Sequence, residues 1–169
     1  MNKSSLRKFY LWLTQEESMS RVPIALKRLT RNDVSWLEPN AKSHQCAINL
    51  PTKSFTQIFE DVQRQEGNTP RREFMVHWYM SDGTKLTNKA SEIVYYHSKS
   101  EFRLLNVPRE YVLDILKVNH LLFFRREGGN LHVTHLGLGG THLVREFGHS
   151  TLVQKLPRRS KKPQDQEQS

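Results

Sequence analysis

The chain contains a succession of short runs rich in aromatic and β-branched residues, and turn signals separate these runs. The clearest signal is SDGT at residues 81–84, because an Asp-Gly pair supports the type I′ turn of a β-hairpin. A second hairpin signal, EGGN at residues 127–130, separates two further apolar runs. Parallel βαβ units would instead need a helical crossover between strands. The spacing therefore predicts a mainly β fold, a barrel or a sandwich, and argues against a βαβ sheet.

The strand-like runs are short, and we expect about seven strands in the folded domain. They cover residues 22–29, 46–50, 74–80, 92–96, 102–106, 121–126 and 131–136, with a weak last strand near residues 151–153. Residues 30–43 between the first two runs are mostly polar, and we expect a long loop there. No internal repeat is present.

Two short helices are expected between the strands, and a third before them. Thr52 is a suitable cap for a helix that ends at Gly67-Asn68. Pro108 is expected to begin a second helix over residues 109–116, and residues 6–17 have the pattern of an N-terminal helix. The apolar stripe of the first of these helices is Phe55, Ile58, Phe59 and Val62.

Basic residues outnumber acidic ones in this chain of 169 residues, with a formal net charge of +9 and a pI of about 9.8. Such a surplus favours a polyanionic partner, although it can also serve solubility alone. Residues 155–169, KLPRRSKKPQDQEQS, have the composition of a basic and polar linker. The preceding residues, 1–154, still carry 21 basic and 15 acidic residues. We therefore expect one basic domain over residues 1–154, followed by a linker.

Several classes of protein are disfavoured. Cys46 is the only cysteine, so an internal disulfide is impossible and a cytoplasmic setting fits. The first residues lack the apolar segment of a signal peptide. No apolar run approaches the roughly 20 residues that span a membrane. We expect neither secretion nor a membrane partner.

Signals of catalysis are weak. His132 and His135 lie three apart on an expected strand, which places them on opposite faces, and one cysteine does not complete a zinc site. The glycine-rich residues 137–140 lack the lysine of a phosphate-binding loop, and no Gly-x-Ser-x-Gly motif occurs. Glu101-x-Arg103 lacks the acidic partner that a metal-dependent nuclease would need. We expect a chain without catalytic residues, metal or cofactor.

Two polar loops have the chemistry that base reading requires, although each could equally be an ordinary solvated loop. The first supplies Arg31, Asn32, Asp33, Trp36, Lys42, Ser43, His44 and Gln45. The second supplies His97, Ser98, Lys99, Ser100, Glu101 and Arg103. Trp36 could stack on a base, but an apolar anchor for the loop is the stronger interpretation. Candidate phosphate contacts are Arg28, Arg71, Arg72, Lys85 and Lys89.

Both polar loops lie within segments that resemble a known protein family. LKRLTRND at residues 26–33, HQ at 44–45 and INLP at 48–51 resemble the opening of the N-terminal effector domain of EcoRII-type restriction endonucleases. IVYYHS at 93–98 and EFRL at 101–104 resemble its paired strands. FRL at 102–104, the helix after Pro108 and LLFFRR at 121–126 are similar to the plant B-three type of DNA-binding pseudobarrel. The resemblance covers residues 22–136, and the second loop looks shorter than in the family.

The resemblance implies a seven-stranded pseudobarrel with short helices and two arms in the DNA major groove. The arms would be residues 30–45 and the loop around residues 97–103. They would bind a CCWGG-type duplex, guanine through Arg or Lys and cytosine through Asp or Glu. Such a domain belongs to a Type IIE enzyme of the bacterial cytoplasm and does not cut. A C-terminal nuclease domain, absent here, would carry the cleavage and its magnesium, and this chain is expected to be a monomer.

Three alternatives remain at this point. A complete basic nuclease with an unrecognised active site would cleave DNA alone with a divalent metal. An RNA- or protein-binding barrel would prefer single strands, RNA or another chain over a DNA duplex. A plant transcription-factor domain of the same fold is not separated by fold alone, and the Asn-Asp and His-Gln pairs favour the restriction-enzyme branch.

Overall fold

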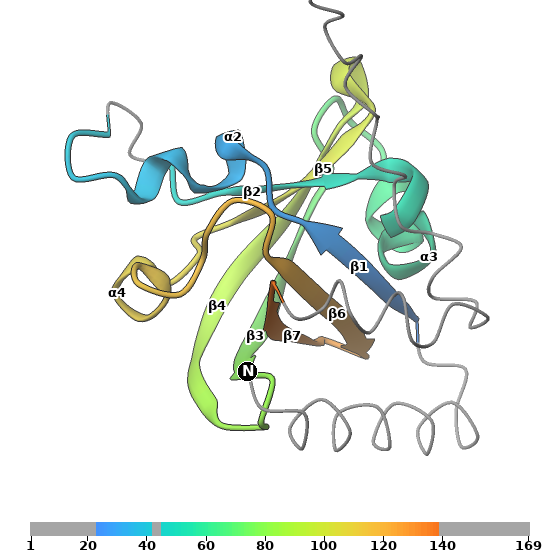
Figure 1. Ribbon diagram of the computed structural model, residues 1–169. Helices are drawn as coiled ribbons and strands as arrows, with labels where there is room; N and C mark the ends of the chain where they lie inside the picture. Colours follow the sequence, from blue (N-terminus) through green and yellow to red (C-terminus); the bar gives the residue numbers. More distant parts are fainter. Residues whose placement is uncertain (1–22, 42–44, 139–169) are drawn as a thin grey trace, which may run out of the picture.

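Seven strands form one strongly curved sheet in the computed structural model, which describes residues 23–41 and 45–138 (Figure 1). They lie in the order β1-β6-β7-β3-β4-β5-β2, and only β3 and β7 pair in parallel. The sheet is nearly closed and barrel-like, which confirms the predicted mainly β pseudobarrel. The strands are β1 (Ile24–Arg28), β2 (Ile48–Pro51), β3 (Arg71–Met80), β4 (Lys85–Tyr96), β5 (Glu101–Leu105), β6 (Leu121–Glu127) and β7 (Asn130–Gly137).

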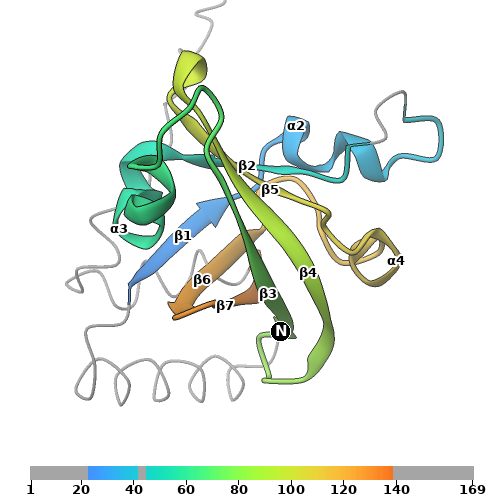
Figure 2. The same ribbon diagram turned by 180° about the vertical axis from the view of Figure 1, so that it is seen from behind.

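Short helices occupy the connections between the strands. The described residues contain α2 (Arg31–Val34), the 3-10 turn η1 (Ser35–Leu37), α3 (Thr52–Gln63), the 3-10 turn η2 (His97–Lys99) and α4 (Arg109–Val112). Figures 1 and 2 show α3 and α4 at opposite ends of the barrel-like sheet. The expected N-terminal helix over residues 6–17, the weak strand near 151–153 and the linker at 155–169 lie outside the described residues.

Helix α3 supplies much of the core. The predicted apolar stripe is confirmed, since its four side chains are at most 1% exposed. Phe55 meets Phe124 of β6 edge to face at 5.1 Å, and Phe59 lies 5.7 Å from Phe74 of β3. Aromatic pairs of this geometry add to the free energy of apolar burial. The sequence placed the helix ends wrongly, because Pro51 occupies the N-cap position and the helix ends at Gln63.

The two predicted hairpins form, but the first turn is not of type I′. Gly83 donates its N–H to the Met80 carbonyl at 3.0 Å, and Met80 donates to the Thr84 carbonyl at 2.8 Å. Gly83 has a φ of 89°, whereas Asp82 does not have the positive φ that a type I′ turn requires. The Asp82 carboxylate instead accepts the Thr84 N–H at 2.8 Å. The second hairpin has the expected two-residue loop, with positive φ at Gly128.

Three predicted boundaries are wrong. Strand β4 begins at Lys85 and not at residue 92, because the long strand β3 pairs with its polar first half. The helix after Pro108 ends at Val112, four residues earlier than expected. Residues 30–43 were expected to be a loop, but they contain α2 and η1. Pairing with β3 overrides the local propensity of the first half of β4, whereas α2 begins at a local capping box between Thr30 and Asp33.

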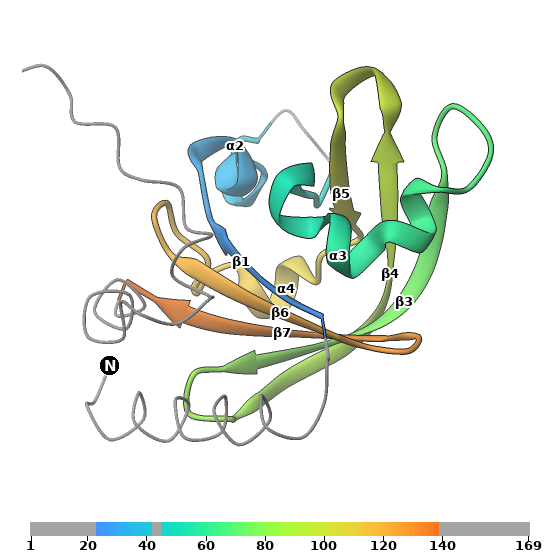
Figure 3. The same cartoon turned by 90° about the vertical axis from the view of Figure 1, so that its right-hand side faces the viewer.

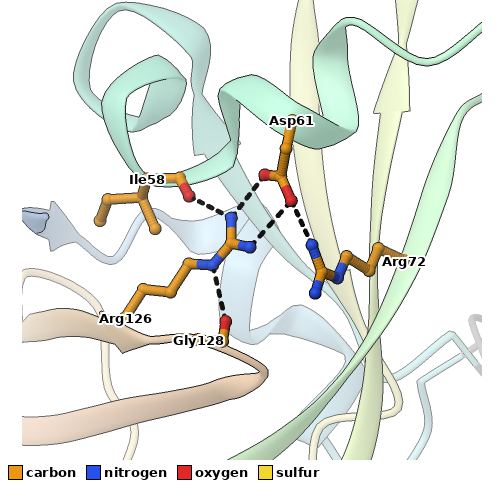
Figure 4. A network of polar contacts seen from close by, with 5 residues as sticks. All are labelled: Ile58, Asp61, Arg72, Arg126 and Gly128. Carbon is orange, nitrogen blue, oxygen red and sulfur yellow. Dashed lines mark hydrogen bonds and ion pairs between the residues drawn. The ribbon is translucent and has the colours of Figure 1, made fainter.

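A carboxylate on α3 joins the helix to two strands (Figure 4). Arg126 of β6 donates to Asp61 Oδ2 at 2.8 Å, to the Ile58 carbonyl at 2.7 Å and to the Gly128 carbonyl at 3.0 Å. Arg72 of β3 also binds Asp61. The hydrogen bonds and charges of Arg126 and Arg72 lower the pKa of Asp61 to about 2. This network fastens α3 against the sheet.

Replacing Asp61 with asparagine should therefore destabilise the fold. We expect Asp61→Asn to lower the free energy of unfolding by about 1 to 2 kcal/mol, because Arg126 loses its charged acceptor. Urea unfolding followed by tryptophan fluorescence measures this change. The control is Glu60→Gln, since Glu60 pairs with Arg64 at the exposed surface and should contribute less than about 1 kcal/mol. Equal losses in the two variants would contradict a special role for Asp61.

Candidate nucleic-acid interface

Two connections of the chain lead into the short ladder between β2 and β5, and we call them the first and second arms. The first arm, residues 30–45, connects β1 to β2, and the second arm, residues 97–103, is the tip of the β4–β5 hairpin and the start of β5. The ladder pairs Ile48 with Leu104 at the end next to the first arm and Pro51 with Glu101 at the other end. Four residue pairs span about 10 Å. The described parts of both arms lie in the upper half of Figure 3.

A strip of polar side chains lies on the ladder, between the first arm and the hairpin tip at residues 97–100, and it includes the last residues of the second arm. Along β5, Phe102 and Leu104 point into the core, so Glu101 and Arg103 point outward. Asn49 of β2 lies directly opposite Arg103. We call Asn49, Glu101 and Arg103, together with Tyr96 at the end of β4, the inter-arm strip. Its amide, carboxylate and guanidinium groups are those that bind base edges in the major groove.

Arg103 is held in one orientation within this strip. Its Nε and Nη2 donate to Glu101 Oε1 at 2.8 and 2.6 Å, and its guanidinium lies 4.8 Å from the centre of the Tyr96 ring. The Arg103 and Glu101 side chains are 20% and 23% exposed. A pre-oriented guanidinium loses less side-chain entropy when it binds a ligand. The arrangement can therefore present Arg103 and Glu101 as one unit.

The tip of the second arm is tied down at its base and exposed at its end. Ser100 adopts a left-handed conformation with a φ of 48°, and its carbonyl accepts a hydrogen bond from the Thr52 hydroxyl of α3. The His97 ring meets Tyr95 edge to face at 4.8 Å. Residues 97–100 are all exposed, so Lys99 projects from a fixed support.

In the described part of the first arm, exposed polar side chains lie near both ends. Arg31 and Asn32 are exposed at the start of α2, and Gln45 is exposed just before β2. These positions agree with a role in binding. The other candidates of this arm, Lys42, Ser43 and His44, lie outside the described residues.

Asp33 and Trp36 were also candidates for base contacts, and the structure corrects this assignment. They are only 1% and 3% exposed, so neither can meet a base in this conformation. The Trp36 indole packs in the core and donates its N–H to the Asp33 carbonyl at 2.6 Å. The alternative interpretation of Trp36, an apolar anchor for the arm, therefore holds.

The five candidate phosphate contacts do not form one surface. Lys85 and Lys89 lie in the first half of β4, whereas the second arm follows its last residue. Twelve residues of strand span on the order of 35 Å, and the β3–β4 turn lies at the bottom of Figure 1 with the second arm at the top. The structure thus removes Lys85 and Lys89 from the surface of the arms.

The three arginines among these candidates already have partners. Arg28 donates to the Asn119 carbonyl at 3.3 Å, Arg71 lies 3.6 Å from Glu92, and Arg72 binds Asp61. Arg71 is still 59% exposed, and such an exposed pair is weak enough to be exchanged for a phosphate. Arg72 is occupied by the α3 network and has a structural role.

A further exposed cation, Lys53, lies beside the second arm and was not among the candidate site residues. Lys53 is the second residue of α3. Its neighbour Thr52 binds the Ser100 carbonyl, so Lys53 lies close to the second arm. Among the described residues, Lys53, Arg31 and Lys99 form no ion pair with one another or with an acidic group. Loop chemistry could not identify Lys53, because this residue lies on a helix and in neither polar loop.

The net charge is concentrated outside the described residues. Residues 23–41 and 45–138 contain fifteen Lys and Arg and twelve Asp and Glu, and six of the twelve carboxylates pair with a Lys or Arg. The described domain is therefore nearly balanced. Binding of a polyanion there depends on where the cations without an acidic partner lie. Arg31, Lys53 and Lys99 lie on or beside the arms, whereas Lys85 and Lys89 lie in the first half of β4, away from them.

The described residues contain no group of three or more His, Cys, Asp and Glu arranged for a metal ion. His132 and His135 lie on opposite faces of β7, as predicted. The His132 ring stacks on His77 at 4.9 Å, whereas His135 is buried and contacts His120. Over the same residues, no helix has the length and apolar character of a membrane span.

No protein-family model matches this chain, and no curated protein matches it. The resemblance to EcoRII-type effector domains therefore depends on the residue patterns given above.

Proposed function

We propose that this chain binds double-stranded DNA by placing its two arms in the major groove, and that it does not cleave DNA. The observation that carries the proposal is the inter-arm strip, with the first arm at one end and the hairpin tip of the second arm, residues 97–100, at the other. The major groove is about 12 Å wide, which is close to the roughly 10 Å length of the β2–β5 ladder. Arg31, Lys53 and Lys99 would bind phosphates or base edges around it, since positioning contacts come mainly from such side chains.

The resemblance adds a finer proposal. The chain would be the effector domain of a Type IIE restriction endonuclease in a bacterial restriction-modification system, and it would act as a monomer on a CCWGG-type site. Arg103 would bind a guanine, and Glu101 would accept a hydrogen bond from a cytosine amino group. Cleavage and magnesium would belong to a separate C-terminal nuclease domain.

The direct test is a fluorescence-anisotropy titration near physiological salt. It compares a duplex that contains CCWGG with a scrambled duplex, with and without magnesium, because salt determines the phosphate contribution. Tight binding to the CCWGG duplex without cleavage is the expected result. Equal weak binding to both duplexes would overturn sequence-specific recognition. Cleavage with magnesium would show a nuclease, and preferential competition by RNA or single strands would show a different nucleic-acid partner.

Two substitutions test the arms separately. We expect Arg31→Ala and Arg103→Ala each to weaken binding to the specific duplex by about 1 to 3 kcal/mol, with a smaller effect on a scrambled duplex. Lys85→Ala is the matched control. Lys85 is an exposed cation at the far end of β4, so its removal should leave both affinities nearly unchanged. Equal losses on both duplexes would contradict base contacts by Arg31 and Arg103.

A further inference from the structure

One buried carboxylate, that of Asp33, binds β1, the start of the first arm and β2. Asp33 Oδ2 accepts hydrogen bonds from the Thr30 N–H at 2.8 Å and the Thr30 hydroxyl at 2.7 Å, and it pairs with Lys27 Nζ at 2.8 Å. Asp33 Oδ1 accepts the Asn49 N–H at 2.9 Å. The side chains of Lys27 and Asp33 are 7% and 0% exposed. The carboxylate is thus removed from solvent and fully engaged.

These contacts cross the opening of the pseudobarrel. Lys27 belongs to β1 and Asn49 to β2, and these strands are the two edges of the sheet order. The first arm is the connection between them. Asp33 therefore joins the two edges and holds both ends of the first arm, at Thr30 and at Asn49. Because Asn49 pairs with Arg103, the same bond fixes the arm relative to the inter-arm strip.

Stability alone does not explain an ion pair at this place. The desolvation of two buried charges offsets much of their attraction, and an apolar pair of similar volume often stabilises a fold equally well. An apolar pair would not bind the Thr30 and Asn49 N–H groups, however. The property that is special to the carboxylate is its directed bonds to two backbone segments, and these bonds determine where the arm begins and ends.

We propose that Lys27 and Asp33 are positioning residues for DNA binding: their ion pair holds the first arm at the spacing from the second arm that the major groove requires. This inference rests on the proposed function. It replaces the base contact predicted for Asp33 with an action through Thr30 and Asn49. Lys27, which was not among the candidate site residues, has the same role.

The test uses Asp33→Asn in the full chain. Asparagine keeps the shape of the side chain but turns one acceptor into a donor, which then faces the donors of Thr30, Asn49 or Lys27. The matched control is Asp61→Asn, which also removes one carboxylate from a cation network but lies on α3, away from the first arm. All variants are compared at a temperature where circular dichroism shows them folded.

We expect Asp33→Asn to weaken binding to the specific duplex at least tenfold and to weaken a scrambled duplex much less. Asp61→Asn should leave both affinities within about twofold of wild type. Hydrogen exchange of the Thr30 and Asn49 amides, measured without DNA, should become faster in Asp33→Asn and stay unchanged in Asp61→Asn. A role in overall stability alone would not produce this separation between the two variants.

The possible failures are distinguishable. If the wild-type chain binds no duplex, the proposed function is wrong, and the inference falls with it. If the wild type binds and Asp33→Asn binds equally well, or loses both duplexes to the same extent, only the positioning role is overturned. Unchanged exchange at Thr30 and Asn49 would likewise overturn it, whatever happens to affinity.

Discussion

The variant Asp33→Ala should lose about 3 to 5 kcal/mol of its free energy of unfolding, because it leaves Lys27 charged and buried without its partner. It also removes the acceptor of two backbone N–H groups, those of Thr30 and Asn49. Unpaired buried donors carry the full cost of their desolvation. Urea unfolding at pH 7 measures the loss, and little change in the slope m would show that the unfolded state is unaltered.

A double-mutant cycle separates the charge from the hydrogen bonds. Lys27→Met keeps most of the apolar stem of Lys27 and removes its charge, so the double variant with Asp33→Ala should be more stable than Asp33→Ala alone. The part of the loss that remains is then due to Thr30 and Asn49. If the double variant is no more stable than the single one, the buried ammonium does not cause the loss.

The sequence predicted those parts of the fold that depend on local pattern. Both hairpins were found from their glycine-containing turns, and the buried face of α3 was found from the spacing of Phe55, Ile58, Phe59 and Val62. These signals act within a few residues, so no knowledge of the partner strand is needed. The type of the turn at Gly83 and the start of β4 depend on the pairing with β3, and the sequence did not predict them correctly.

The same distinction applies to the candidate site. Loop chemistry pointed to residues 30–45 and 97–103, and in the structure the first segment precedes one end of the β2–β5 ladder and the second runs into the other end. Loop chemistry did not show that Asp33 is buried, because the group that binds it, Lys27, lies on a strand with alternating exposure. It also failed for Lys85 and Lys89, whose distance from the arms depends on the full length of β4. Burial and distance are set by long-range pairing.

The second large effect should appear on acidification. His135 is 8% exposed, and its Nε2 lies 2.8 Å from Nδ1 of His120. Burial, and then the neighbouring His120, lower the pKa of His135 from 6.5 to about 4. Burial also lowers the pKa of His120. The folded protein therefore keeps His135 neutral at pH values at which the unfolded chain binds a proton.

Stability should consequently be complete above pH 6.5 and fall as the pH decreases from 6.5 to 4, by about 3 kcal/mol for His135 alone. Asp61 acts in a lower window, because its pKa shift from 3.8 to about 2 costs stability only below pH 3.8. Urea unfolding at pH 7, 6, 5 and 4 measures the loss. His135→Gln cannot titrate and should flatten the profile in this window, whereas His97→Gln on the exposed second arm should not. A steep loss that survives in His135→Gln would assign the effect to other groups.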